Sequence, residues 1–359
     1  MIPFLQLTPG EDAQAVREGI ERVITRGWFI LGPELDAFER EFATASGATA
    51  AIGVGTGTDA LAIALRALGI GRGDEVITSP LSAAYSALAI MMVGARPVFA
   101  DIDPHRLTLD PQAAAAAVTP RTAAILPVHL YGQPADMIAI ASIAERHSLA
   151  IVEDCCQAHL ATCAGRPVGS FGAAAAYSFY PTKNLGALGD GGAVTTSDAQ
   201  LAARARRLRN GGQTDRYHHG EFGVNSRLDE MQAAVLRARL LLLPGWTSTR
   251  RTLAAEYRER LTGATRVTVP PLLDEGHVHH LFPVQSPSRQ EVQNTLRDAG
   301  VETLIHYPVP IPKQPALASE QPADCPVANR VCDEIFSLPL YPSLRRDAID
   351  IVAAALMQG

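Results

Sequence analysis

Short apolar runs alternate with amphipathic helical patterns through the first two thirds of this 359-residue chain. Such alternation predicts an α/β fold in which a mostly parallel sheet carries helices on both faces. Ligands of open α/β sheets bind beyond the carboxyl ends of the strands. Strands are expected at residues 50–54, 75–78, 97–100, 123–128, 150–152, 174–179 and 192–196, and helices at 58–68, 82–93, 111–118 and 137–147.

The last third of the chain has a different pattern. Helices dominate from residue 197 to about residue 261, and a segment containing Pro and Gly follows at 263–277. Beyond it a smaller α+β unit is expected, with strands at 281–284 and 302–305 and helices at 290–299 and 346–356. A chain of this length can hold two domains. We expect a large domain with an N-terminal arm over residues 1–245 and a small C-terminal domain over residues 246–359.

Charge and cysteine content argue against several classes of protein. The net charge is −6 and no Lys/Arg-rich run occurs, which argues against a nucleic-acid-binding surface. No secretory signal is expected, and no stretch approaches the roughly 18 apolar residues that cross a bilayer. The five cysteines are odd in number and form no paired CxxC motifs, so neither a disulfide framework nor a metal site is expected. These features favour a cytoplasmic protein.

One lysine stands in an unusual setting. Lys183 lies within the segment 178–186, Ser-Phe-Tyr-Pro-Thr-Lys-Asn-Leu-Gly, and no other basic residue occurs between residues 181 and 203. Such surroundings can keep an amine partly out of water, where its neutral nucleophilic form is accessible. Carbonyl chemistry through a lysine Schiff base needs that form. The alternative is a loop lysine with a solvated tip.

A glycine-rich turn joins the first expected strand to the helix after it. Residues 53–61 read Gly-Val-Gly-Thr-Gly-Thr-Asp-Ala-Leu, and the first turn of the helix offers free N–H groups to a phosphate. The turn is not a dinucleotide fingerprint, because Thr58 stands where Gly or Ala is required, and no Gly-Lys-Ser/Thr of a P-loop occurs. The alternative is a tight turn without a ligand.

An acidic pair, Glu153 and Asp154, follows the expected strand at 150–152. An acid at the end of a strand can hold a proton on a heterocyclic nitrogen; the alternative is an acidic cap on the next turn. Asp154 precedes Lys183 by 29 residues, so the two side chains can face opposite edges of one flat ring. A lysine, a carboxylate and a phosphate-binding turn are what pyridoxal 5′-phosphate (PLP) requires.

In this order the motifs resemble those of the DegT/DnrJ/EryC1/StrS sugar aminotransferases, which are fold-type I PLP enzymes. The resemblance covers nearly the whole chain and implies a seven-stranded sheet in a PLP-binding large domain. It rests on Glu153-Asp154 with Gln157-Ala158-His159, on segments 178–186 and 223–230, and on segments 57–61, 73–77 and 129–137.

The resemblance implies roles for the matching residues. Lys183 would bind PLP covalently and move the proton during transfer, and Asp154 would pair with the ring nitrogen. The active unit would be a homodimer. His159 would lie near the ring or be a core histidine, and His129 and Tyr131 would belong to the site or be structural. The remaining cofactor contacts would be Gln157 at the ring hydroxyl, and the Gly57 and Thr58 amides, the Ser178 hydroxyl and Asn225 of a second subunit at the phosphate.

The segment 304–315 narrows the resemblance. It is most similar to enzymes that aminate C3 of a dTDP-linked 3-keto-6-deoxyhexose, and His306 and Tyr307 would contact the substrate; the alternative is a Pro-rich crossing. The expected reaction moves an amino group from L-glutamate to such a keto sugar nucleotide in deoxyamino sugar biosynthesis. A C4 or cyclitol transaminase is an alternative. The sequence does not identify the residues that bind the nucleotide diphosphate. Arg250 and Arg251 are candidates, but each could equally be a solvated surface residue.

Departures from the family pattern leave the aromatic cover of the PLP ring open. Ser82-Ala83 stand where many members have Thr-Phe, Tyr85 would point elsewhere on a regular helix, and Gly211 replaces a common aromatic.

Three other functions share some of these features. By the same resemblance, a PLP-dependent sugar dehydratase would carry histidine in place of Lys183, so Lys183 argues against it. An NAD(P)-dependent reductase shares the alternation, but its fingerprint is broken and Glu75 begins a strand instead of ending one. A non-catalytic sensor is disfavoured by the intact set of Lys183, Asp154 and Ser178.

Overall fold

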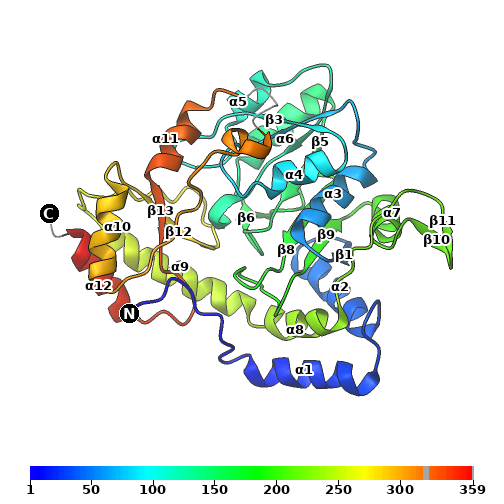
Figure 1. The fold of residues 1–359 in the computed structure, drawn as a ribbon, viewed down its shortest axis with the longest axis horizontal. Helices are drawn as coiled ribbons and strands as arrows, with labels where there is room; N and C mark the ends of the chain where they lie inside the picture. Colours follow the sequence, from blue (N-terminus) through cyan, green and yellow to red (C-terminus); the bar gives the residue numbers. More distant parts are fainter. Residues whose placement is uncertain (318–322, 358–359) are drawn as a thin grey trace.

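The computed structural model describes residues 1–317 and 323–357, and a seven-stranded sheet lies at its centre (Figure 1). The strand order is β1-β9-β8-β5-β4-β2-β3, and within this sheet only β9 runs antiparallel to its neighbours. The predicted α/β fold with a mostly parallel sheet is therefore confirmed. The strands are β1 (Ala50–Val54), β2 (Glu75–Thr78), β3 (Arg96–Phe99), β4 (Thr122–Leu126), β5 (Ala150–Asp154), β8 (Ala174–Ser178) and β9 (Gly192–Thr196).

Helices cover both faces of the sheet, because successive side chains of each strand point to opposite sides. Ile52 and Val54 of β1 enter one buried core, and Ala51 enters the other. One face carries α3 (Gly57–Ala67), α4 (Tyr85–Met92) and α7 (Ala199–Arg209), and the other carries α2 (Pro33–Ala45), α6 (Met137–His147) and α8 (Glu230–Leu240). Helix α1 (Ala13–Arg26) packs along α8, and α5 (Pro111–Ala116) along α6.

An aromatic cluster connects the second core to the end of β8. The ring of Phe179 meets those of Phe38 and Phe42 edge to face, with centroids 5.3 and 5.2 Å apart. Such pairs contribute about 0.5–1.5 kcal/mol each beyond their buried area. This anchor fixes the point at which the chain leaves the sheet and enters the loop that holds Lys183.

The C-terminal part has a core of its own. The antiparallel pair β12 (Phe282–Gln285) and β13 (Ile335–Leu338) packs with α9 (Leu243–Arg260), α10 (Arg289–Asp298) and α12 (Arg346–Met357). Ile2 joins this core and bridges to Val301, so the N-terminal arm returns to the small unit. Helix α9 continues unbroken through the predicted boundary at residue 245, and that division stays a prediction.

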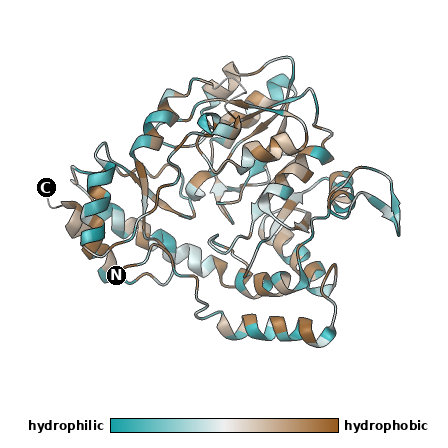
Figure 2. Cartoon of the chain, in the orientation of Figure 1, coloured by the Kyte–Doolittle hydropathy of each residue, from teal (hydrophilic) through white to brown (hydrophobic). Residues whose placement is uncertain are grey.

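Several elements differ from the sequence prediction. Residues 302–305 form no strand; Leu304 makes only an isolated bridge to Ser337 of β13, a strand that was not predicted. Helix α4 begins at Tyr85 instead of 82, because the amide of Leu81 donates to Ser79 Oγ and the chain turns there. A polar hairpin, β10 (Gln213–Asp215) and β11 (His218–His219), interrupts the helical stretch after residue 197 (Figure 2).

The remaining elements are short. They are the hairpin β6 (Thr162–Cys163) and β7 (Arg166–Pro167), the helix α11 (Pro326–Glu334), and the 3-10 turns Leu130–Gly132, Ile311–Lys313 and Pro315–Leu317. Across the described ranges, the helices all lack the combination of length and apolar character that crossing a membrane requires.

Candidate active site

Lys183 and Asp154 meet at the carboxyl ends of β5 and β8, which are parallel neighbours. Asp154 ends β5, and Lys183 lies in the loop after β8, where its amide donates to the Tyr180 carbonyl at 2.8 Å. Burial lowers the pKa of Lys183, while Cys156 and Asp154 beside the amine oppose that shift. The structure thus brings together the two residues that the sequence paired, and it gives the lysine the lowered pKa that a nucleophilic amine needs.

Two donors hold the Asp154 carboxylate. Oδ2 accepts from the Ser86 hydroxyl at 2.8 Å, and Oδ1 accepts from the Cys156 amide at 3.1 Å. The carboxylate is almost fully buried, so these bonds fix its direction. Ser86 is a residue that sequence reasoning missed. Its position on the otherwise apolar helix α4 was the available signal.

The start of α3 has the form of a phosphate cradle. Thr56 caps the helix by accepting from the Asp59 amide at 3.0 Å, and the Gly57 and Thr58 amides have no partner among the described residues. A Cβ on Gly57 would lie 2.8 Å from Cβ of Ser178, so only glycine allows this close approach. Unfilled amides at a helix start beside a hydroxyl are the donors that a phosphate requires, and this arrangement fits the predicted group.

Asn225 lies at the surface near this turn. Its backbone bridges to Asn210, and its neighbour Ser226 accepts from the Gly55 amide at 2.9 Å and donates to Asp59 at 2.7 Å. Asn225 itself is exposed, so its side chain faces outward from this chain. The predicted contact of Asn225 with a phosphate of a second subunit stays a prediction.

Gln157 ties the C-terminal segment to the site. Its Oε1 accepts from the Tyr131 amide at 2.8 Å, and its Nε2 donates to the Tyr307 hydroxyl at 3.1 Å. The Tyr131 hydroxyl donates to the carbonyl of His306. Tyr307, the predicted substrate contact, is therefore hydrogen-bonded to Gln157, the predicted contact of the cofactor ring. Burial raises the pKa of Tyr307 to about 12, so its hydroxyl keeps its proton at neutral pH.

His306 is partly buried and contacts residues of two other segments, unlike a residue of an exposed Pro-rich connection. Its Nδ1 is 3.1 Å from the Ser337 hydroxyl, and its ring packs 5.6 Å from that of Phe4 in the N-terminal arm. Burial, together with the charge of Lys183, lowers its pKa to about 4. His306 is thus a neutral side chain within electrostatic reach of the lysine.

His129 is structural. Its Nδ1 accepts from the Ala135 amide at 3.0 Å, so its Nε2 carries the proton and lies 3.1 Å from Glu153. The Glu153 carboxylate also accepts three backbone amides, at 2.7 to 2.8 Å. His129, Glu153 and Cys155 lie within 4.8 Å of one another, but burial keeps the pKa of the Cys155 thiol well above its usual value. His129 and Glu153 therefore form an internal hydrogen-bond hub.

Tyr131 is structural too. It is buried and adopts a positive φ of 60°, and its carbonyl accepts from the amides of His280 and Leu281. These bonds join the turn after β4 to the start of the small unit.

His159 is buried at the same edge of the sheet, and neither of its ring nitrogens has a hydrogen-bond partner among the described residues. Burial, with the charge of Lys183, lowers its pKa to about 3, so the ring is neutral. Unpartnered buried nitrogens are unfavourable in a closed core. Their position close to Lys183 fits a site that a polar ring completes.

Comparison with known proteins decides the family. The model of the DegT/DnrJ/EryC1/StrS aminotransferase family matches residues 11–357. This chain belongs to that family. The dTDP-3-amino-3,4,6-trideoxy-alpha-D-glucose transaminase of Streptomyces venezuelae is 48% identical over 352 residues, which cover 96% of this chain and 92% of that protein. The predictions of an aminotransferase and of its family are therefore confirmed.

Two solved structures show the same fold over nearly the whole chain. DesV of S. venezuelae is 46% identical, with a TM-score of 0.97 over 99% of this chain and 98% of that one. NtdA of Bacillus subtilis, solved with bound cofactor PMP, is 32% identical, with a TM-score of 0.92 over 99% of this chain and 84% of that one.

The aromatic that the family resemblance led us to expect before α4 is absent here. Ala83 takes its place, and Tyr85 stands at the first position of α4 with 62% of its surface exposed. Tyr85 precedes Ser86, which holds Asp154, and its ring is largely exposed.

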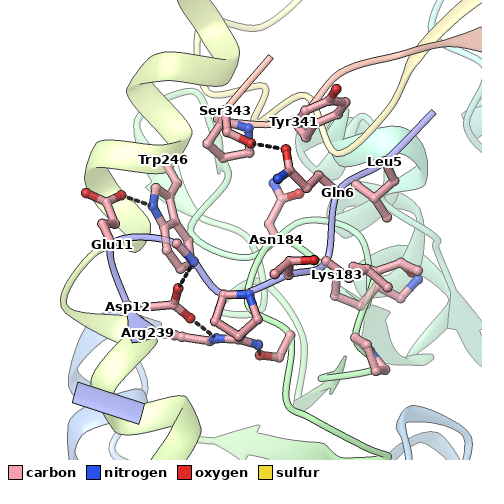
Figure 3. A pocket seen from close by; sticks show the side chains of 18 of the residues that line it. Leu5, Gln6, Glu11, Asp12, Lys183, Asn184, Arg239, Trp246, Tyr341 and Ser343 are labelled. Carbon is pink, nitrogen blue, oxygen red and sulfur yellow. Dashed lines mark hydrogen bonds and ion pairs between the residues drawn. The ribbon is translucent and has the colours of Figure 1, made fainter. Parts of the chain in front are cut away.

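An ion pair that the sequence did not predict, between Arg239 and Asp12, braces the lysine loop. Arg239 of α8 donates to the Gly186 carbonyl at 2.6 Å, and its Nε lies 2.8 Å from Asp12 of the N-terminal arm (Figure 3). Both charged groups are buried. The arm, the loop and α8 are therefore fixed to one another beside Lys183.

Proposed function

We propose that this protein is a PLP-dependent sugar-nucleotide aminotransferase, active in the cytoplasm as a homodimer. It would move the amino group of L-glutamate to C3 of a dTDP-linked 3-keto-6-deoxyhexose. The observation that carries the proposal is that Lys183 and Asp154 lie at the ends of neighbouring strands, close enough for the carboxylate to influence the pKa of the amine, with the open amides of α3 near Ser178. These are the three kinds of group that bind PLP.

Each residue has one task in this proposal. When bound, PLP supplies an aldehyde that accepts the amino group and a ring that withdraws electrons. Lys183 binds the aldehyde carbon, and Asp154 holds the proton on the ring nitrogen. The phosphate is held by the amides of Gly57 and Thr58 and by the Ser178 hydroxyl. Gln157 reaches the ring hydroxyl, and Asn225 of the partner subunit completes the phosphate site.

Lys183 is also the group that moves the proton during amino transfer. Its pKa is lowered by burial, so a larger fraction of the amine is neutral and able to accept a proton at neutral pH. His306 and Tyr307 reach the site from the small unit and are the proposed sugar contacts. Both are uncharged at neutral pH, which suits hydrogen bonds to sugar hydroxyl groups better than to a free phosphate.

The choice of C3 rests on relatives. Besides the S. venezuelae enzyme, the dTDP-3-amino-3,6-dideoxy-alpha-D-galactopyranose transaminase of Aneurinibacillus thermoaerophilus is 44% identical, with 99% of both chains covered. EryC1 of Saccharopolyspora erythraea, named a sensory transduction protein, is 47% identical over the whole chain. A purely regulatory role gives no reason for a half-buried lysine whose pKa is influenced by a buried carboxylate, so we favour catalysis.

The test follows the two halves of the reaction separately. Protein supplied with PLP is mixed with L-glutamate, and the visible absorption of the cofactor is recorded. We expect the band to shift to that of the aminated cofactor and to return when a dTDP-3-keto-6-deoxyhexose is added. If L-glutamate leaves the band unchanged, the donor is wrong. If only 4-keto sugar nucleotides or keto cyclitols restore it, the assignment to C3 is wrong.

A further inference from the structure

A pocket of about 390 Å³ lies behind the lysine loop (Figure 3). We call it the arm pocket, because residues 5–12 of the N-terminal arm form one wall. The lysine loop, α9 and residues 341–343 form the others. Lys183 lines this pocket and also lies in the field of Asp154, so the arm pocket adjoins the predicted reaction site. Its volume lies within the range of about 300–1,000 Å³ that small-molecule sites occupy.

Arg250 is the unusual member of the lining. It is 4% exposed, and its Nη1 donates to the carbonyls of His279, His280 and Leu340. Its Nε is buried without a hydrogen-bond partner, and no carboxylate pairs with it among the described residues. Burial lowers its pKa to about 10, so it remains a cation at neutral pH. A buried cation without an anion is costly unless a ligand completes it.

The acids of the arm pocket do not neutralise Arg250. Asp12 is paired with Arg239, and Glu11 accepts from the indole N–H of Trp246 at 2.6 Å. Lys183 adds a second cation to the lining. The wall shared by α9 and the lysine loop is therefore positive, while the acids lie along the arm.

We propose that the arm pocket binds an anionic group of a substrate, with Arg250 supplying the buried positive charge. The chemistry is that of a carboxylate or a phosphate. The naming of its two sources, the carboxylate of the amino donor and the diphosphate of the sugar nucleotide, rests on the proposed function. The binding site itself does not depend on that function.

Thr249 provides a test that leaves Arg250 in place. Replacing Arg250 would remove bonds to three carbonyls and could unfold the protein. Thr249 lines the pocket on α9 and Thr252 does not, yet both are exposed and both hydroxyls donate to the carbonyl four residues earlier. T249E places a carboxylate in the arm pocket beside Arg250, and T252E places the same charge on the same helix outside it.

Binding is read from Trp246, which lines the pocket. The chain has two tryptophans, so the W28F variant leaves Trp246 as the only one. The PLP-loaded W28F protein is titrated with glutarate, which has no amino group to transfer, and with inorganic pyrophosphate. Sodium chloride at equal ionic strength is the reference. We expect one of the two anions to change the fluorescence, T249E to weaken its binding about tenfold or more, and T252E to change it less than twofold.

The arms of the titration identify the source. Glutarate as the tighter anion assigns the arm pocket to the amino donor, and T249E then raises the KM for the donor alone. If pyrophosphate binds more tightly, the arm pocket belongs to the sugar nucleotide, and T249E then raises the KM for the sugar nucleotide alone. The proposal is overturned if neither anion differs from chloride, or if T249E and T252E weaken binding equally. Failure of amino transfer with intact anion binding would instead contradict the proposed function.

Discussion

Glu153 is a buried hub next to Asp154 in β5, and its replacement by glutamine is the sharpest test of the site's scaffold. Oε1 accepts from the amides of Phe171 and Gly172, and Oε2 accepts from the amide of Gly169 and from His129. All four partners are donors, and the side chain is fully buried. Glutamine has the same shape, but its NH₂ group cannot accept a hydrogen bond.

E153Q therefore leaves two donors facing an NH₂ group, whichever way the amide is turned. A hydrogen bond to a charged group contributes about 1.5–3 kcal/mol, so losing two costs about 3–6 kcal/mol. Native proteins have a total free energy of unfolding of about 5–15 kcal/mol, and the loss is a large part of that range. His129 cannot relieve the clash by changing tautomer, because its Nδ1 accepts from Ala135.

Equilibrium unfolding in urea, followed by circular dichroism, measures this loss. The control is E145Q, because Glu145 is exposed on α6 and its replacement should change the free energy of unfolding by about 0.5 kcal/mol or less. A decrease below about 1 kcal/mol for E153Q, with an unchanged denaturant slope, would refute the assignment of four donors to one carboxylate.

Three further outcomes are expected. G57A should weaken PLP binding more than tenfold in equilibrium dialysis, because its Cβ would lie 2.8 Å from that of Ser178; unchanged affinity would contradict the cradle. R239M should raise hydrogen exchange at the Ala187 amide, which donates to the Phe179 carbonyl in the same loop, and lower the free energy of unfolding by about 3–5 kcal/mol, since Asp12 would be left buried and unpaired. Burial alone would raise the pKa of Glu75, but hydrogen bonds from two arginines and a threonine lower that pKa to about 2. Its contribution is complete above pH 4.5 and is lost as pH falls toward 2, so E75Q should lose less stability over that interval in acid titrations.

The sheet was predictable because its determinants are local. The runs at 50–54, 75–78 and 192–196 carry the apolar pattern of buried strands and end at turn residues, and the structure places strands there. β13 (Ile335–Leu338) was missed because it follows α11 (Pro326–Glu334) with no turn residue between them. Periodicity separates elements poorly where no such residue marks a boundary.

The motifs predicted which residues gather at the site, but not what holds them. Ser86 and Asp154 are 68 residues apart, and Arg239 and Asp12 are 227 apart, so no local pattern connects either pair. The role of His129 depends on which of its nitrogens accepts from Ala135, and a sequence does not contain that information. Such contacts follow from the packing of complete elements.

The central claim is that Lys183 is the residue that binds PLP covalently, and the chain suits a direct test because its lysines are Lys183 and Lys313. Protein loaded with PLP is reduced with borohydride, digested and analysed by peptide mass spectrometry. The account predicts a phosphopyridoxyl group on Lys183, retained in K313R and absent in K183A. A label on Lys313, or no label with PLP in excess, would contradict it.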